Sequence, residues 1–162
     1  MKDVSFLKDG KTLAIGSHRY RKDGGNVILT RYDGHKSRVD VPYGVTEIGD
    51  EAFAGTKINE VLLPPSLKTI GKKAFYGSAV RKIRLPSSVQ TVCERAFDCS
   101  GLTALSIDNP NVFLYPEVFD HAYDLTEIVF AGTRDRWEEV FAEQTYSASF
   151  VVHFSDGTTK QY

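Results

Sequence analysis

Residues 60–80 read EVLLPPSLKTIGKKAFYGSAV, and this stretch contains one complete unit of the pattern that decides the fold. Val61 and Leu63 alternate with Leu62, so in a short strand the first two side chains face a core and Leu62 faces outward. Pro64 ends this strand, because proline has no N–H group to donate to a further ladder bond. The unit therefore begins with a short strand that is buried on one side.

The second part of the unit brings the chain back to the start of a new strand. Leu67 and Ile70, three residues apart, are expected to return the chain along the other side of the core. Gly71 permits a tight or left-handed corner, because glycine has no Cβ. Phe75 and the alanine before it then turn inward, and Gly77 redirects the chain toward the next strand. One such unit cannot bury its apolar side alone, so it must stack on copies of itself.

The unit recurs with a period of 22 residues. Ala-Phe pairs stand at 52–53, 74–75 and 96–97, and Val-Phe follows at 118–119. Four aliphatic columns keep the same step: Val45, Leu67 and Val89; Ile48, Ile70, Val92 and Leu114; Val39, Val61, Ile83 and Leu105; Val41, Leu63, Leu85 and Ile107. This agreement predicts a solenoid, mainly β with short helical turns, whose strands are parallel neighbours about 4.8 Å apart.

Two sets of repeated side chains suggest how the stack is held in register. The phenylalanine column is expected to form a buried spine, although an aromatic ligand platform is the alternative; its members are Phe53, Phe75, Phe97 and Phe119. The outward strand positions are Arg38, Glu60, Lys82 and Ala104, and the first three alternate in sign, which places opposite charges on neighbouring turns. Corner pairs such as Lys72-Lys73 above Glu94-Arg95 repeat this arrangement. Exposed pairs of this kind set register more than they add stability.

The composition excludes several classes of protein. With 20 basic and 21 acidic side chains the net charge is −1, so binding to nucleic acid is not expected. Cys93 and Cys99 are too few for a disulfide framework or a four-cysteine metal site, and we expect two buried free thiols, with a bridge as the alternative. No signal peptide or membrane span is visible, so we expect a soluble, cytoplasmic chain without membrane insertion; a trimmed, secreted or surface protein is the alternative.

We expect a single domain over residues 1–162 in three parts: an N-terminal cap (1–35), the repeats (36–130) and a C-terminal cap (131–162). The apolar stretches TLAIG and NVILTRY predict strands in the first cap. In the second, Thr133 is a plausible N-cap of a short helix that buries Trp137, and residues 149–154 predict a strand. Caps are needed because a repeat array must close its open apolar ends.

The repeated segments VPYGVTEIGDEAFAG, LPPSLKTIGKKAFYG and LPSSVQTVCERAFDC resemble the BspA-type, or Treponema pallidum-type, leucine-rich repeat. The likeness covers roughly residues 27–158, and it departs from the family where Cys93 replaces a glycine and where the fourth unit degenerates. The resemblance implies a right-handed, curved solenoid with its strands on the concave side. It also implies bacterial proteins that are often at the cell surface and sometimes adhesive, and it transfers no catalytic residues.

The sequence contains no recognisable motif of catalytic or metal-binding residues. The histidines, His18, His35, His121 and His153, lie outside metal-ligand spacing of one another, so we expect no metal and no cofactor. Asp120 precedes His121, but adjacent side chains are expected to point apart, and no nucleophile motif accompanies them. We therefore do not expect an enzyme.

The sequence favours a protein–protein interaction module with an unidentified protein partner, the protein itself being monomeric or weakly self-associating. A structural or degenerate repeat fragment is the alternative, and an enzyme or small-ligand site hidden in the caps is a third class. The expected partner-binding residues are Glu60, Leu62, Lys82 and Arg84, which combine an outward leucine with an arginine on the central strands.

Two further observations shape this hypothesis. Ala104 and Ser106 follow in the same columns and would leave Lys82 and Arg84 without acidic neighbours on that side, which favours an acidic partner segment. Five strands about 4.8 Å apart give a face of roughly 300–400 Å², below the 800 Å² per partner of a standard interface. The strand face alone would then bind weakly.

Overall fold

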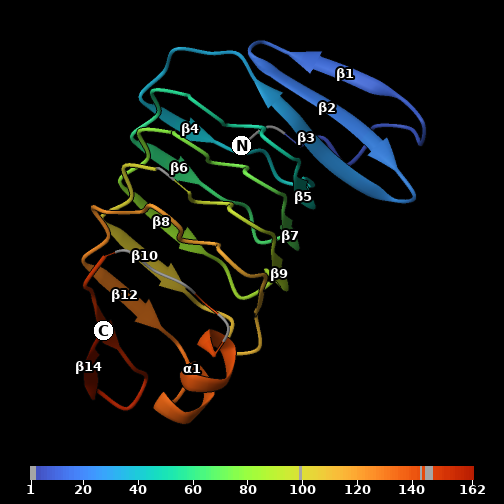
Figure 1. The fold of residues 1–162 in the computed structure, drawn as a ribbon. Coiled ribbons are helices and arrows are strands. Elements are labelled where there is room, and N and C mark those ends of the chain that lie inside the picture. Colours follow the sequence, from blue (N-terminus) through green and yellow to red (C-terminus); the bar gives the residue numbers. More distant parts are fainter. Residues whose placement is uncertain (1–2, 99, 143, 145–147) are drawn as a thin grey trace.

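The computed structural model describes residues 3–98, 100–142, 144 and 148–162, and it is a solenoid with strands on two sides. Figure 1 shows the turns stacked from the N-terminal β-hairpins at the top to the helix and the last strands at the bottom. The strands form two seven-stranded sheets, one on each side of a shared core. The stacked-unit fold that the sequence predicts is therefore confirmed.

The first sheet, here the β1–β11 sheet, contains in spatial order β1 (Thr12–Ile15), β2 (His18–Asp23), β3 (Asn26–Tyr32), β5 (Glu47–Ile48), β7 (Thr69–Ile70), β9 (Thr91–Val92) and β11 (Phe113–Leu114). The second, here the β4–β14 sheet, contains β4 (Arg38–Asp40), β6 (Glu60–Leu62), β8 (Lys82–Leu85), β10 (Ala104–Ile107), β12 (Glu127–Phe130), β13 (Val151–His153) and β14 (Thr159–Gln161). The short strands of the first sheet lie in the part of each unit where the sequence predicts a return of the chain along the other side of the core but no strand.

The pairing register follows the repeat. Val39 lies beside Val61, and Ile48 lies beside Ile70, so each residue neighbours the one 22 positions further along the chain. These aliphatic side chains are buried, whereas Leu62 between two inward positions is 43% exposed. The alternation that the sequence predicts for this strand is therefore present.

The phenylalanine column is a buried spine, as expected. The rings of Phe53, Phe75 and Phe97 are stacked, with centroids 5.2 and 5.3 Å apart, and Phe119 continues the stack at 6.0 Å. None of these side chains is more than 2% exposed. Tyr32 packs on the spine at its N-terminal end, with its ring centroid 5.5 Å from that of Phe53. An aromatic ligand platform is therefore excluded.

The corner of the repeat differs from the prediction for Gly71. The left-handed backbone stands two residues later, at Lys73 (φ 53°), and the equivalent Glu51 and Arg95 have the same conformation. Gly71 is required for space instead, because a Cβ there would lie 2.6 Å from Asp50 Oδ1. The prediction for Gly77 was right, since its φ is +59°.

The N-terminal part contains an antiparallel ribbon of three strands. β2 pairs with both β1 and β3, and β3 then pairs in parallel with β5 of the repeats. The strands in TLAIG and NVILTRY are present, but β2 was not predicted, because its sequence HRYRKD is almost entirely polar. The ribbon extends only the β1–β11 sheet, so β4 remains the edge strand of the other sheet.

The C-terminal part contains the helix α1 (Arg134–Phe141), and Thr133 is its N-cap as predicted. Trp137 on this helix is fully buried, and its ring stacks on Phe141 at 3.7 Å. The predicted last strand is β13, and it does more than close the stack, because it pairs in parallel with β12 and antiparallel with β14. The β4–β14 sheet is therefore about 29 Å wide at 4.8 Å per strand, longer than expected from five strands.

Candidate interaction groove

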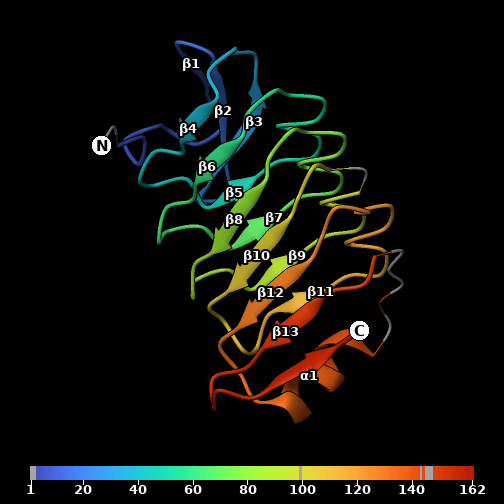
Figure 2. The ribbon, with the colours of Figure 1, turned by 90° about the vertical axis from the view of Figure 1, so that its left-hand side faces the viewer.

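A groove of about 820 Å³ runs over the outer face of the β4–β14 sheet. In Figure 2 this face is turned toward the viewer, and β6, β8, β10 and β12 lie side by side in front of the short strands of the other sheet. The outward side chains of these four strands line the groove, together with residues of the loops that precede and follow them. The repeat thus presents two side chains per strand to a partner.

All four residues that the sequence singles out line this groove: Glu60, Leu62, Lys82 and Arg84. Their assignment as binding residues stays a prediction, and the structure adds where they lie relative to one another. Glu60 and Lys82 are neighbours in register on β6 and β8, and Lys82 is followed by Ala104 on β10. The sequence therefore identified side chains that share one surface.

The floor of the groove lies over β10, where both outward side chains are small. Ala104 stands between Lys82 on β8 and Glu127 on β12, and Ser106 stands between Arg84 and Val129. Larger side chains thus rise on both sides of a low central strand. An incoming side chain can reach the strand surface there and contact both walls.

The charges in the groove differ from the prediction for Arg84. This residue was expected to lack an acidic neighbour toward the C-terminus, but its Nε lies 2.7 Å from Asp108 Oδ2. Glu60 is also engaged, with its carboxylate 3.3 Å from Arg38 Nη1. Among the residues that the structure describes, the groove cations without an ion-pair partner are Arg81 and Lys82. The three cations of the lining are balanced by three carboxylates, Glu60, Asp108 and Glu127, so the groove has no net charge. The unpaired positive charge is therefore local, and it lies on Arg81 and Lys82 rather than on Arg84 as expected.

Sequence analysis missed three contributors to the groove. Val129 is 44% exposed and supplies a second outward aliphatic side chain, matching Leu62. It belongs to the same column, but the late Leu125 shifts the fifth strand by one residue and hides this. Arg81 and Asp108 lie just outside β8 and β10, where strand alternation makes no prediction.

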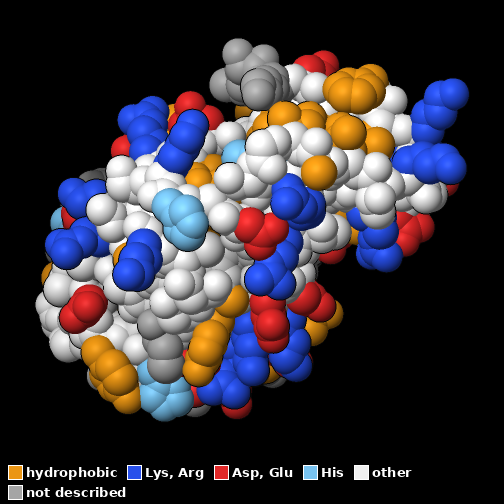
Figure 3. Space-filling model, turned by 90° about the horizontal axis from the view of Figure 1, so that it is seen from above, with side chains coloured by type: hydrophobic (Ala, Val, Ile, Leu, Met, Phe, Trp, Pro, Cys, Tyr) orange, Lys and Arg blue, Asp and Glu red, His pale blue; other side chains and the backbone are white. Residues whose placement is uncertain are grey.

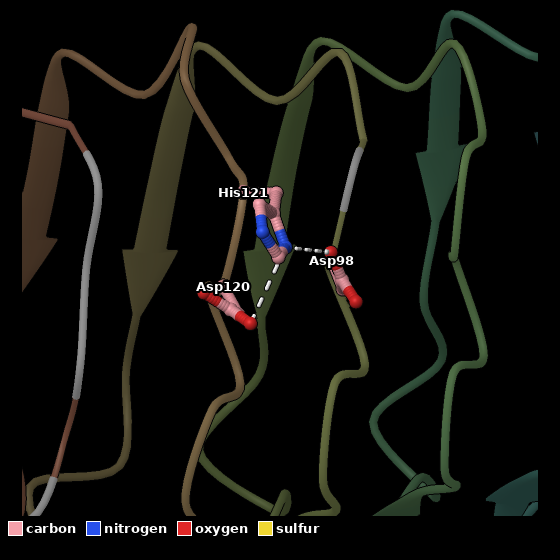
Figure 4. Close-up of side chains that lie close together, drawn as sticks. All are labelled: Asp98, Asp120 and His121. Carbon is pink, nitrogen blue, oxygen red and sulfur yellow. Dashed lines mark hydrogen bonds and ion pairs between the residues drawn. The ribbon is translucent and has the colours of Figure 1, made fainter.

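A separate cluster joins Asp98, Asp120 and His121 on the corner of two adjacent turns (Figure 4). His121 Nδ1 lies 3.1 Å from Asp98 Oδ1 and 3.3 Å from Asp120 Oδ2. The expectation that Asp120 and His121 point apart is wrong, because His121 adopts a left-handed backbone with φ 54° that turns its ring toward Asp120.

Both carboxylate oxygens of Asp98 already have partners among neighbouring side chains. Its side chain is fully buried, and Arg95 Nε donates a hydrogen bond of 2.7 Å to its other oxygen. That hydrogen bond raises the pKa of the Arg95 guanidinium. Aspartate and histidine are residue types that bind metals. Here the Asp98 carboxylate already pairs with Arg95 and His121, so we interpret the cluster as a structural contact between adjacent turns, here called the clasp.

Among the described residues, Cys93 lines neither the groove nor a metal-ligand cluster. Cys93 is a free, partly buried thiol whose pKa is raised by burial, and Cys99 lies outside the residues that the structure describes. No helix among the described residues is long and apolar enough to span a bilayer.

Comparison with known proteins identifies the class to which this fold belongs. Residues 32–146 match the model of the BspA type leucine rich repeat region in six copies, and the chain belongs to this family. The earlier resemblance is thereby confirmed. No curated protein matches the sequence.

Solved structures agree with this assignment. A leucine-rich repeat protein from Bacteroides capillosus is 27% identical, with a TM-score of 0.65, over 75% of this chain and 99% of that one. The Treponema pallidum leucine-rich repeat protein is 22% identical, with a TM-score of 0.51, over 74% of this chain and 71% of that one. A leucine-rich cell surface protein of Faecalibacterium prausnitzii shares the fold at 16% identity and a TM-score of 0.55; the match covers 94% of this chain and 61% of that protein.

Proposed function

We propose that this protein is a non-catalytic protein-interaction module whose groove over β6, β8, β10 and β12 binds an extended, acidic segment of a protein partner. The observation that carries the proposal is the groove itself. It combines two exposed aliphatic side chains, Leu62 and Val129, with two cations that have no ion-pair partner among the described residues, Arg81 and Lys82.

The arrangement of these groups supports an extended segment rather than a compact ligand. Leu62 and Val129 stand on β6 and β12, three strand steps apart, so roughly 14 Å separates them at 4.8 Å per strand. A segment crossing the strands would contact Leu62, pass over the low floor at Ser106, and reach Val129. An acidic side chain near the middle would lie beside Lys82.

The affinity is expected to be modest, because a face of this size is smaller than a standard interface. The charges contribute mainly to specificity and association rate, and the aliphatic contacts contribute most of the burial. Adhesion at a bacterial surface is one use of such a module, and the Faecalibacterium protein of the same fold is described as a leucine rich cell surface protein.

The test is selection from a random peptide library on the immobilised protein. We expect the selected peptides to be rich in Asp and Glu and to carry a large apolar residue. They should bind the variant Leu62→Ser with Lys82→Glu at least tenfold more weakly than the parent.

The matched control makes the same two kinds of change away from the groove, at Tyr76→Ser with Lys68→Glu. Both of these side chains are exposed and neither lines the groove. Equal binding of the selected peptides to both variants would contradict the proposed site. A library that returned basic peptides would contradict the proposed partner chemistry.

A further inference from the structure

β4 has an open edge at the N-terminal end of the β4–β14 sheet, because among the described residues its only paired strand is β6. Ser37 O accepts a hydrogen bond from Glu60 N, and Val41 N donates one to Leu62 O. Alternate residues of a parallel strand point their backbone groups to opposite sides. The N–H and C=O groups of Arg38 and Asp40 therefore face the open edge.

A hollow of about 640 Å³ lies beside this edge, at the end of the molecule seen from above in Figure 3. It is lined by β4 and by the turn that joins β1 to β2, including Ile15 and Ser17. The buried rings of Tyr20 and Tyr32 line it as well. The hollow thus occupies the position in which a preceding turn of the solenoid would place an inward side chain.

The chemistry of the hollow suits an aliphatic side chain. Tyr32 is the N-terminal end of the aromatic spine, and Val39 is the first member of a column of inward aliphatic residues. Burial raises the pKa of Tyr20 to about 12, so this wall is uncharged near neutral pH. A strand laid along β4 would point its central side chain over Val39 and into this space.

The strand that already pairs with β4 on its other side indicates which sequence the edge accepts. β6 places Glu60 beside Arg38 and Val61 beside Val39, and Arg38 Nη1 lies 3.3 Å from the Glu60 carboxylate. The Arg38 guanidinium is exposed, and its Nε lies 3.4 Å from Asp40 Oδ1 on the same strand. An incoming strand with an acidic residue next to Arg38 and an aliphatic residue next to Val39 would repeat these contacts.

A single extended chain fits this edge better than a second copy of the protein. The turn between β1 and β2 lines the hollow beside β4, so a whole sheet approaching β4 would meet this turn. One strand needs only about 4.8 Å beyond β4. Unpaired edges are also the usual place for strand addition by a peptide.

We propose that β4 is a second recognition site, at which an extended partner segment with an acidic residue followed by an aliphatic one adds in parallel as an eighth strand of the β4–β14 sheet. Its aliphatic side chain enters the hollow between Val39 and the β1–β2 turn, and its acidic residue pairs with Arg38. This site is separate from the groove and stands whether or not the groove binds a partner.

The probe is a capped peptide, KINEVLL, which copies residues 57–63 and therefore the strand chemistry that β4 already accepts. In a parallel addition, the N–H of its valine donates to Arg38 O. Methylation of that nitrogen removes the donor and should weaken binding roughly tenfold, since it costs a hydrogen bond and adds a clash. In NMR titrations of the parent protein, shift changes should be confined to residues 15–20, 32 and 36–42.

Two protein variants separate the contributions. Arg38→Glu should weaken the binding of KINEVLL. The same variant should bind KINKVLL, in which lysine replaces the glutamate, about as tightly as the parent protein binds KINEVLL. Asp40→Pro removes an N–H that faces the open edge, a place where proline is tolerated, and should weaken both peptides. Thermal unfolding verifies that each variant is folded.

The proposal is overturned by any of four results. The first is the absence of saturable binding of KINEVLL to the parent protein. The second is binding whose shift changes map to the groove, and the third is equal affinity of the methylated peptide. The fourth is a dimer in sedimentation whose β4 amides are protected from exchange, which would assign the edge to a second copy.

Discussion

Arg84 Nε lies 2.7 Å from Asp108 Oδ2, so this ion pair joins residues 24 apart in a chain whose repeat is 22 residues long. The extra two residues place the carboxylate just beyond β10, where it meets an arginine that the repeat alone would leave unpaired. Arg84 is 77% exposed, whereas Asp108 is only 26% exposed. Asp108 therefore neutralises one wall of the groove.

Replacement of Asp108 by asparagine should make the groove more basic. We expect Asp108→Asn to change the free energy of unfolding by less than about 1 kcal/mol, because the pair is largely exposed. Acidic peptides that bind the groove should bind the variant more tightly. The control is Glu94→Gln, which breaks the exposed pair between Lys72 and Glu94 away from the groove. Unchanged peptide affinity in Asp108→Asn would show that Arg84 takes no part in binding.

The aromatic spine should dominate stability in the centre of the stack. Phe75 is fully buried and stacked on both sides, so Phe75→Ala should cost about 3–5 kcal/mol of unfolding free energy in chemical denaturation. Phe113, which is 58% exposed, supplies the matched control, and Phe113→Ala should cost far less. A cost below about 1 kcal/mol for Phe75→Ala would mean that the spine is not the core.

The corner of the repeat gives a prediction of opposite sign at two neighbouring residues. Gly71→Ala should destabilise by about 1–3 kcal/mol, because its Cβ would press on Asp50. Lys73→Gly should be neutral or stabilising by up to about 1 kcal/mol, since glycine relieves the left-handed backbone there. A neutral Gly71→Ala together with a destabilising Lys73→Gly in thermal unfolding would contradict this account of the corner.

The clasp at Asp98 should behave as a structural contact. Asp98→Asn removes the charge that Arg95 and His121 share, and we expect a loss of about 2–3 kcal/mol, as for other buried, charged hydrogen bonds. Zinc added to the parent protein should leave the unfolding temperature unchanged. A stabilisation by zinc that disappears in His121→Ala would instead identify a metal site.

The parts of this molecule that could be predicted are those that repeat. The 22-residue columns, the buried spine and the outward position of Leu62 follow from burying one side of each unit, and stacking amplifies that signal. Strands of only two residues, such as β7, show no alternation, so the sequence marks Ile70 as a buried column position but does not predict a strand there. The contact between Asp98 and His121 was also hidden, because it depends on a left-handed backbone at a residue other than glycine.

The regularity of the repeat explains why four side chains of the groove could be named from the sequence and why others were missed. Glu60, Leu62, Lys82 and Arg84 lie in regular columns, and the structure places them on one surface. Val129 lies where the fourth unit has lost its spacing, and Asp108 lies beyond the end of a strand. Irregular segments change the charge and shape of a repeat surface without changing its architecture.

The β1–β11 sheet ends at β11 on the side away from the N-terminal ribbon. Gln144 is buried there, and its Nε2 donates hydrogen bonds to Tyr115 O at 2.8 Å and Leu114 O at 3.3 Å. Its Oε1 accepts one from Val118 N at 3.4 Å. In the preceding unit, Val92 O, which is equivalent to Leu114 O, accepts a hydrogen bond from the next turn, whereas Ala96 N bonds to Cys93 O within its own turn. The Gln144 amide thus replaces a next-turn donor at Leu114 and bridges Val118 N and Tyr115 O, the pair equivalent to Ala96 and Cys93.

Gln144→Leu keeps the size of the side chain and removes this amide, so it leaves buried backbone groups without partners and should cost about 1–3 kcal/mol of unfolding free energy. Hydrogen exchange at the Val118 amide should accelerate by more than the global loss of stability explains. Gln161→Leu is the control, because Gln161 also donates through its amide in the same C-terminal part but is exposed. If both variants lose the same small amount of stability, the edge of β11 is satisfied by other groups and Gln144 does not close the sheet.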